Sequence, residues 1–144
     1  MKKLILFLSC ICMAFLVFTS CNDDDDPSPK ERTAERLTSK DWDVESWTED
    51  GAELIPSPVS SFEMEYSDWD GDEGDFEWTY NLSGDVFIER GEFEINEAGD
   101  ELELKFQQGG GNFSGSFEMN IEFDGDELML DGTLGGFRYE IVAD

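Results

Sequence analysis

The feature that constrains the fold most is a strict alternation of apolar and polar residues, which runs from Asp41 almost to the end of the chain. A period of two puts every second side chain on one face of an extended strand, so each run predicts a strand with one buried face. The residues in between are mainly Glu, Asp, Thr, Ser and Asn, which makes the other face acidic. The apolar positions are Trp42 and Val44; Phe62, Met64 and Tyr66; Phe76, Trp78, Tyr80 and Leu82; Val86 and Ile88; Phe93 and Ile95; Leu102, Leu104 and Phe106; Phe117, Met119, Ile121 and Phe123; Leu128 and Leu130; and Phe137, Tyr139 and Ile141.

Turn sequences separate these runs at short intervals. They are Asp50-Gly51, Asp70-Gly71, Gly84-Asp85, Ala98-Gly99-Asp100, Asp124-Gly125 and the glycines at 109–111 and 135–136. Short connections join antiparallel neighbours, so the sequence predicts an all-β, antiparallel up-and-down meander of about eight strands. Such a sheet must hide its apolar face, and closure into a barrel does this most simply. A short helix is expected before it, in residues 31–37.

The first 20 residues have a different character. Lys2 and Lys3 precede fifteen uncharged residues, from Leu4 to Phe18. A positive end followed by an apolar run of this length is typical of a secretory signal peptide. The run is shorter than the roughly 20 apolar residues that a membrane span needs. We therefore expect residues 1–20 to be removed from the mature protein.

The end of this run, Phe18-Thr19-Ser20-Cys21, resembles the lipobox of bacterial lipoproteins, with Phe18 in place of the usual leucine. The resemblance implies that Cys21 becomes the N-terminus and carries fatty acyl chains such as palmitate, which anchor the protein to a membrane. The other two cysteines, Cys10 and Cys12, fall inside the signal peptide, so no cysteine is left to pair with Cys21. The alternative is an ordinary signal peptide in which Cys21 merely falls near the cleavage site.

Four consecutive aspartates, Asp23 to Asp26, follow the cysteine. The run resembles the acidic export signal found just after the lipidated cysteine of surface lipoproteins in some Gram-negative anaerobes. It also suits a solvated spacer, because like charges repel and keep a segment extended. Pro27 and Pro29 stiffen the end of this tether, residues 21–29. We expect an outer-membrane lipoprotein that is exposed on the cell surface.

The charge of the chain excludes some partners. Its formal net charge is −27, and loss of residues 1–20, which hold two lysines and no acidic residue, makes this −29. A chain this acidic is repelled by nucleic acid, because binding phosphates requires the opposite sign. Residues 30–144 are rich in regularly spaced aromatic residues, unlike a disordered acidic segment, and their length suits one domain with one core.

Four short motifs lie in the barrel region: Leu37-Thr38-Ser39-Lys40-Asp41-Trp42-Asp43-Val44, Asp50-Gly51, Arg90-Gly91-Glu92-Phe93-Glu94-Ile95 and Asp126-Glu127-Leu128-Met129-Leu130. Together with a final aromatic strand, they resemble the motifs of the bacterial lipocalin-like lipoproteins, which implies a lipocalin-like barrel in residues 30–144. In lipocalins a Gly-x-Trp sequence opens the first strand, and an arginine near the last strand packs over that tryptophan. Trp42 matches the tryptophan, and Lys40 takes the place of the glycine. Arg138 falls on the face opposite its neighbours in the last strand, so Trp42 also suits a plain core residue at the closed end.

The composition argues against an enzyme. The chain has no histidine and no cysteine after Cys21, so the usual neutral-pH base, thiolate nucleophile and zinc ligands are missing. A pair of carboxylates could hydrolyse a glycoside, but acidic residues are too numerous for any pair to be informative. We expect a non-enzymatic protein without a cofactor.

One acidic turn is a candidate cation site. Carboxylates at alternate positions around a glycine turn can direct oxygen ligands at calcium. The spacing differs from that of an EF-hand, and a solvated hairpin tip recruits the same residue types. The candidate calcium ligands are Asp68, Asp70, Asp72 and Asp75.

Two functional classes remain open. In the first, the barrel binds a small apolar or amphipathic ligand inside, as the lipocalin resemblance implies and as an eight-stranded barrel allows. In the second, the interior is filled with side chains, and the protein contacts another envelope protein through its surface. The candidate ligand-binding residues are Trp78, Tyr80, Phe106, Phe117, Met119 and Tyr139.

Overall fold

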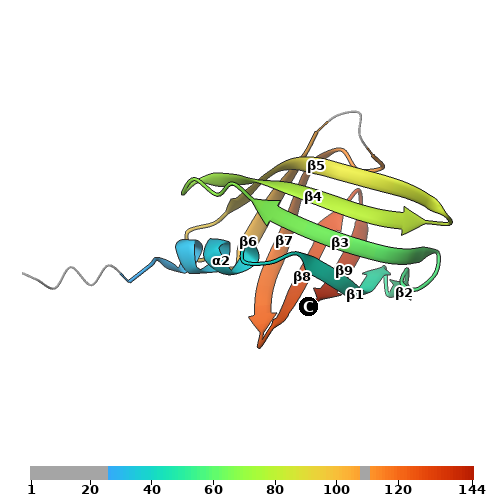
Figure 1. The fold of residues 1–144 in the computed structure, drawn as a ribbon, viewed down its shortest axis with the longest axis horizontal. Helices are drawn as coiled ribbons and strands as arrows, with labels where there is room; N and C mark the ends of the chain where they lie inside the picture. The colour runs from blue at the N-terminus through green and yellow to red at the C-terminus, as the bar shows by residue number, and fades with distance from the viewer. Residues whose placement is uncertain (1–25, 108–110) are drawn as a thin grey trace, which may run out of the picture.

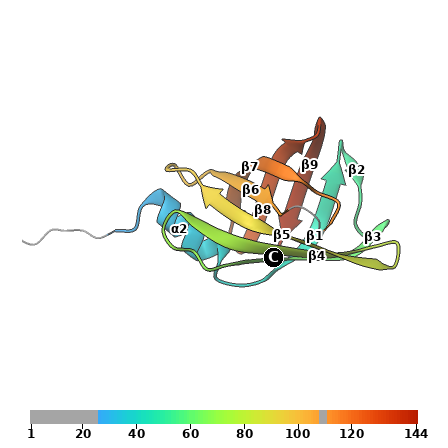
Figure 2. The same ribbon diagram turned by 90° about the horizontal axis from the view of Figure 1, so that it is seen from above.

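The fold is a closed antiparallel barrel preceded by one short helix, as the sequence predicts. The computed structural model describes residues 26–107 and 111–144, and Figures 1 and 2 show the arrangement of their helix and strands. The elements are α2 (Pro29–Leu37), β1 (Trp42–Glu49), β2 (Ala52–Glu53), β3 (Val59–Ser67), β4 (Glu73–Leu82), β5 (Asp85–Ile95), β6 (Glu101–Phe106), β7 (Gly115–Asp124), β8 (Glu127–Leu134) and β9 (Phe137–Ala143).

The strands follow one another around the barrel in chain order. From β3 to β9 each strand pairs with the next, always antiparallel. The barrel closes because β1 pairs with β3 on one side and with β9 on the other. The two-residue strand β2 is an addition to the expected eight, and it pairs only with the end of β1. The alternation and the turns therefore predicted the topology correctly.

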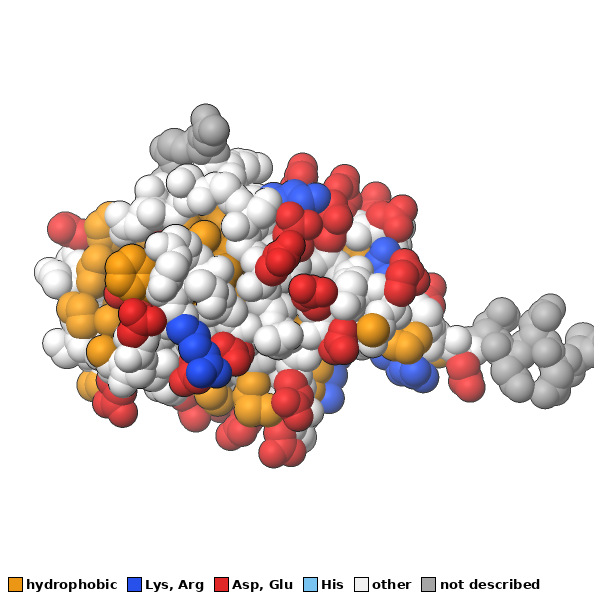
Figure 3. Space-filling model, turned by 180° about the vertical axis from the view of Figure 1, so that it is seen from behind, with side chains coloured by type: hydrophobic (Ala, Val, Ile, Leu, Met, Phe, Trp, Pro, Cys, Tyr) orange, Lys and Arg blue, Asp and Glu red, His pale blue; other side chains and the backbone are white. Residues whose placement is uncertain are grey.

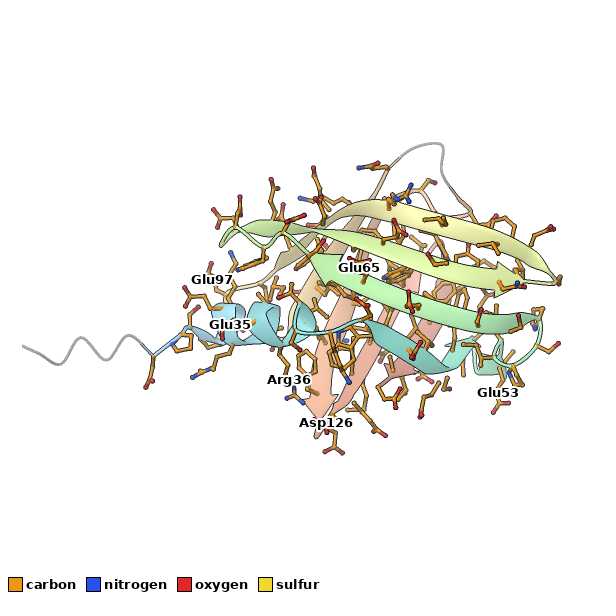
Figure 4. The ribbon with its side chains drawn as sticks, viewed as in Figure 1. Glu35, Arg36, Glu53, Glu65, Glu97 and Asp126 are labelled. Carbon is orange, nitrogen blue, oxygen red and sulfur yellow. The ribbon has the colours of Figure 1, made fainter. Side chains whose placement is uncertain are left out.

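The barrel has two different ends, which we call the helix end and the mouth end. The helix end holds α2 and the connections β3–β4, β5–β6 and β7–β8. The mouth end holds β2, the connections β4–β5 and β8–β9, the end of β6 and the start of β7. Figure 4 shows this separation, with Glu35, Arg36 and Glu97 at the helix end and Glu53 at the mouth end.

Helix α2 closes the helix end. Ser28 caps it in a capping box with Glu31, and Pro29, which the sequence places in the tether, is its first residue. Leu37 is fully buried, and its carbonyl accepts a hydrogen bond of 2.8 Å from Trp42 Nε1. Trp42 is thus the core residue at the closed end. The cation over its ring is Lys40, whose Nζ lies 4.4 Å from the ring centroid, and not an arginine of the last strand.

Side chains fill the middle of the barrel. Phe62, Phe76 and Phe106 surround Trp78, with ring centroids 5.4 to 5.7 Å from it. The indole of Trp78 donates a hydrogen bond of 3.2 Å to the hydroxyl of Tyr66. Every core residue of the described chain lies between residues 34 and 143, so residues 26–144 contain a complete barrel with its own core.

The phase of β5 differs from the prediction. Val86 and Ile88 were expected to face inward, but Val86 is 64% exposed, and the inward positions are the odd-numbered ones from Phe87 to Ile95. Two inward residues conceal this phase in the sequence. Glu89 is charged yet only 1% exposed, and Gly91 has no side chain because a Cβ there would lie 1.9 Å from a backbone oxygen of β6.

Phe137 is the other departure from the predicted core. It is 48% exposed, because it begins β9 at the rim of the mouth end, beyond the level at which the barrel wall encloses it. Its partner across the β8–β9 turn, Leu134, is only partly buried. The alternation therefore places Phe137 on the correct face of the strand and overestimates its burial.

The N-terminal predictions fall outside the described residues. These include the signal peptide in residues 1–20, the acyl site at Cys21 and most of the acidic run, Asp23 to Asp26, of which only Asp26 is described. Within residues 26–107 and 111–144, no helix is both long and apolar enough to span a membrane.

Candidate functional site

The mouth end contains a hollow of about 340 Å³ with a mainly apolar wall. It lies where β1, β3, β4 and β9 meet the segment that leads into β7. Small-molecule sites are typically concave and apolar, with a few polar groups, and this volume lies at the lower end of their usual range. The lining residues are Trp47, Glu49, Leu54, Pro58, Val59, Tyr80, Leu82, Asn112, Phe113 and Tyr139.

A β-bulge places Trp47 in this wall. The pairing of β1 with β9 shifts by one residue between Val44 and Ser46. The shift ends the alternation set by Trp42 and Val44, so Trp47 turns inward in place of Ser46 and is only 5% exposed. Its ring centroid lies 5.0 Å from that of Phe62, 5.7 Å from Tyr80, 6.4 Å from Phe113 and 6.5 Å from Tyr139.

The indole N–H of Trp47 has no hydrogen-bond partner in the part of the chain that the structure describes, although the atom is buried. Burying a donor without a partner costs about 1–3 kcal/mol. The indoles of Trp42 and Trp78, in contrast, each have an acceptor. A ligand oxygen that enters beside Trp47 and pairs with this N–H would remove that cost.

A buried polar network holds the segment before β7 against the barrel. The hydroxyl of Tyr80 donates to Glu89 Oε1 at 2.8 Å, and the backbone N–H of Asn112 donates to the same oxygen. Asn112 Nδ2 donates to the Tyr80 hydroxyl at 2.9 Å. Burial raises the pKa of Tyr80 above its ordinary value, and the Glu89 carboxylate adds to the rise. These bonds position Phe113, the next residue, at the wall of the hollow.

The second charged group of this region, Glu49, lies in the lining itself. It is directly opposite Tyr139 in the β1–β9 pairing. Burial, followed by the hydrogen-bonding and charge of Glu49 and the charge of Asp50, raises the pKa of Tyr139 to about 12. Across the described ranges, Glu49 forms no ion pair with a lysine or arginine. The hollow therefore has negative potential on one side.

The structure separates the six predicted ligand-binding residues into two groups. Tyr80 and Tyr139 line the hollow. The remaining four lie in the barrel core, where each is at most 7% exposed and none is among the lining residues. These core residues are Trp78, Phe106, Phe117 and Met119.

Sequence reasoning missed Trp47, Glu49 and Phe113. Trp47 is out of phase with the start of its own strand, and no residue type marks the bulge that turns it inward. Phe113 lies outside any strand, so no periodicity applies to it. Glu49 is one of many acidic residues, but its place beside the Asp50-Gly51 turn, where the first strand ends, was a usable signal.

The candidate calcium ligands lie at the helix end. Asp70 Oδ1 accepts hydrogen bonds from two backbone N–H groups, one of them that of Asp72 at 3.0 Å, and these hold the pKa of Asp70 below its usual range. Asp72 lies 3.3 Å from Lys30 Nζ. No group of three or more metal-ligating side chains converges among the residues described. Calcium binding by Asp68, Asp70, Asp72 and Asp75 stays a prediction, and these contacts favour a solvated turn.

A larger hollow, of about 520 Å³, lies on the surface of the helix end, between α2 and the β3–β4 connection. Four of its seven lining residues are acidic, and they belong to exposed parts of the chain. A surface hollow of this kind is typical of a solvated acidic face. The smaller hollow at the mouth end combines apolar walls with few polar groups, so we take it as the candidate site.

No protein-family model matches the chain, and no curated protein matches it either. The barrel is compatible with the lipocalin-like fold that the sequence resembles, but a fold alone does not identify a function. The functional conclusion therefore depends on the chemistry of the mouth end.

Proposed function

We propose that this protein is a surface-anchored bacterial lipoprotein whose barrel binds a small, flat, amphipathic ligand at its mouth end, without catalysing a reaction. The observation that carries the binding proposal is the hollow at the mouth, whose apolar wall includes Trp47 with an indole N–H that has no acceptor among the described residues. Aromatic walls favour a flat apolar body, and the N–H favours a ligand with an acceptor oxygen.

The filled core determines where such a ligand lies. Phe117 and Met119 are each 1% exposed and form part of the packed interior, which leaves no role for them as ligand contacts. The ligand therefore sits across the top of the core, against Tyr80 and Tyr139, and is only partly enclosed. This predicts modest affinity for small ligands rather than the enclosure of a long acyl chain.

The proposed anchor gives the mouth an orientation. Asp26, the first described residue, precedes α2 at the helix end, and the mouth lies at the opposite end of the barrel (Figure 1). An acyl anchor on Cys21 would tether the helix end to the membrane. The mouth would then face away from the membrane, toward ligands in solution.

A fluorescent neutral probe, naphthylmethanol, tests the binding proposal with residues 26–144. We expect saturable binding that Leu54→Trp abolishes by filling the hollow. Trp47→Phe should weaken it about threefold to tenfold through the lost hydrogen bond. Trp69→Phe, at the helix end, is the matched control and should leave binding unchanged. Absence of saturable binding, or binding that Leu54→Trp does not affect, would refute the proposal.

The anchor is tested in the full chain by metabolic labelling with a fatty-acid probe. Cys21→Ala should take up no label and should leave the membrane fraction, since Cys21 is the only cysteine at the proposed cleavage site. Label on the Cys21→Ala protein would exclude lipoprotein processing. If the acidic run is an export signal, asparagine at positions 23–26 should keep the label but reduce cleavage by protease added to intact cells.

The exposed apolar rim supports a second candidate, contact with an envelope protein. Val86 and Phe137, the large hydrophobic residues that the described chain exposes, both lie at mouth-end turns. Figure 3 shows hydrophobic side chains gathered toward the end opposite α2. Serine at both positions should leave naphthylmethanol binding intact. If the double serine variant no longer contacts its envelope protein in cells but still binds naphthylmethanol, the protein contact is favoured over the ligand.

A further inference from the structure

The polar groups that remain available at the mouth define the ligand more closely. We propose that the ligand is an organic cation, an amine with a flat apolar body and a neutral acceptor oxygen, whose ammonium group lies against Glu49 and the aromatic rings of the mouth. This inference rests on the binding function proposed above and specifies the chemical class of its ligand.

Most polar atoms at the mouth are already paired with one another. Tyr80, Glu89 and Asn112 share three hydrogen bonds and leave the Glu89 carboxylate only 1% exposed. Among the described lining residues, the indole N–H of Trp47 is a donor without an acceptor, and the carboxylate of Glu49, which also interacts with the Tyr139 hydroxyl, keeps further acceptor capacity for a ligand. A complementary ligand thus offers one acceptor and one donor, and a charged donor pairs more strongly with a carboxylate than a neutral one.

The charges around the hollow have one sign. Glu49 is the single charged residue among the lining residues, and Asp50 follows it at the turn. The nearby cation Arg138 is not available, because its guanidinium lies 2.8 Å from Asp131 and 2.9 Å from Glu140 on the outer surface of the barrel. An anionic ligand such as a fatty acid would lack a counter-charge here and would be repelled by a chain of net charge −27.

The rings of the lining add a second attraction for a cation. Trp47, Tyr80, Phe113 and Tyr139 all line the hollow, and their centroids lie within 6.5 Å of one another along the contacts Trp47–Tyr80, Tyr80–Phe113 and Phe113–Tyr139. The face of an aromatic ring carries partial negative charge, which attracts an ammonium group placed over it. Several rings with one carboxylate are a suitable environment for an amine, whereas rings alone would accept any apolar molecule.

Three probes that share one ring system separate charge from shape: naphthylmethylamine, naphthylmethanol and naphthoate. At neutral pH they are a cation, a neutral molecule and an anion. With residues 26–144 we expect the amine to bind about tenfold more tightly than the alcohol, through cation–π and carboxylate contacts. Naphthoate should bind more weakly than the alcohol. Added salt should weaken the amine more than the alcohol, because screening acts on charge.

The variant Glu49→Gln tests whether Glu49 causes the preference for the amine over the alcohol. It removes the charge and keeps the shape, so the advantage of the amine over the alcohol should fall from about tenfold to about twofold. Glu53→Gln is the matched control, because Glu53 is an exposed acid of the same end that does not line the hollow. It should keep the full preference. Naphthylmethanol should bind the unchanged protein and both variants with equal affinity, which would show that the hollow is intact in all three.

The possible failures are distinct. If none of the three probes binds saturably, the proposed function itself fails. If the alcohol binds and the amine is not preferred, the mouth is a binding site and the cationic ligand class is wrong. A preference for the amine that survives Glu49→Gln, or that Glu53→Gln reduces equally, would also overturn the inference, because it would reflect only the overall negative charge.

Discussion

Trp42 and Trp47 lie in the same strand, five residues apart, and they show how the two ends of the barrel differ. Both are almost completely buried, with exposed fractions of 1% and 5%. The indole of Trp42, at the helix end, donates to the Leu37 carbonyl beneath a closing helix. The indole of Trp47, at the mouth end, has no acceptor in the described structure and lies beside a hollow. The comparison shows that the helix end is closed and paired, and it supports our proposal that the mouth end binds a ligand.

Truncation of the two tryptophans should show the largest difference in stability between the two ends of the barrel. Trp42→Ala should lower the free energy of unfolding by about 3–5 kcal/mol, because it leaves a cavity in a closed part of the core. Trp47→Ala should lower the free energy of unfolding clearly less, because one side of Trp47 borders the hollow and is not packed. The substitution also removes a buried donor that has no partner among the described residues. Denaturant unfolding of residues 26–144 measures both. An equal or larger loss at Trp47 would contradict the division of roles.

Enlargement of a side chain tests the same comparison in the opposite direction. Met119→Trp should overpack the filled core and cost about 1–3 kcal/mol, while probe binding at the mouth persists. Leu54→Trp, at a partly exposed position beside the hollow, should change stability by no more than about 0.5 kcal/mol and should block the probe. Thermal unfolding and probe titration give both quantities. A Met119→Trp protein of normal stability that no longer binds would place the ligand in the core.

Replacement of each tryptophan by phenylalanine isolates the indole N–H. Trp42→Phe should lose about 1 kcal/mol or more, because the Leu37 carbonyl is left without its donor. Trp47→Phe should cost less or even stabilise the fold, since the donor that it removes has no partner among residues 26–107 and 111–144. Chemical denaturation of both variants provides the comparison. Equal losses would mean that the Trp47 N–H is satisfied in solution.

Tyrosine ionisation should show a smaller difference between core and mouth. Burial raises the pKa of Tyr66 above that of Tyr139, for which it is about 12. Because the pKa of Tyr139 is raised in the folded state, its full contribution to the free energy of unfolding is present below the ordinary tyrosine pKa of 10.0. This contribution is lost as the pH rises through about 12. Ultraviolet titration should therefore detect no tyrosinate near pH 10 in the folded protein, and Tyr139→Phe should remove the first step. Ionisation of Tyr139 near pH 10 would show that it is not buried beside Glu49.

The alternation predicted the barrel because most strands bury one face completely, so the sheet and its order follow from the period of two and the turns. It failed where a residue faces inward without being apolar. Glu89 and Gly91 concealed the phase of β5, and Gly91 is small because β6 approaches it closely. Such positions depend on tertiary contacts that no single strand contains.

The mouth was harder to predict than the core for a related reason. Tyr80 and Tyr139 follow the alternation and were among the predicted ligand residues, but the position of Trp47 in the hollow depends on a bulge and that of Phe113 on a segment outside the strands. The predicted ligand set therefore consisted largely of core residues. Binding residues at the end of a barrel are positioned by irregular backbone, which hydrophobic periodicity does not reveal.

The indole N–H resonances of the four tryptophans offer the most direct test of the division between the two ends. Trp47 lines the mouth, Trp78 lies in the core, and Trp42 and Trp69 lie toward the helix end. When naphthylmethylamine is titrated into residues 26–144, we predict that the Trp47 resonance shifts strongly and saturably while those of Trp42 and Trp69 stay in place. A saturable shift at Trp42 or Trp69 with none at Trp47, or no saturable shift at any of them, would contradict the account.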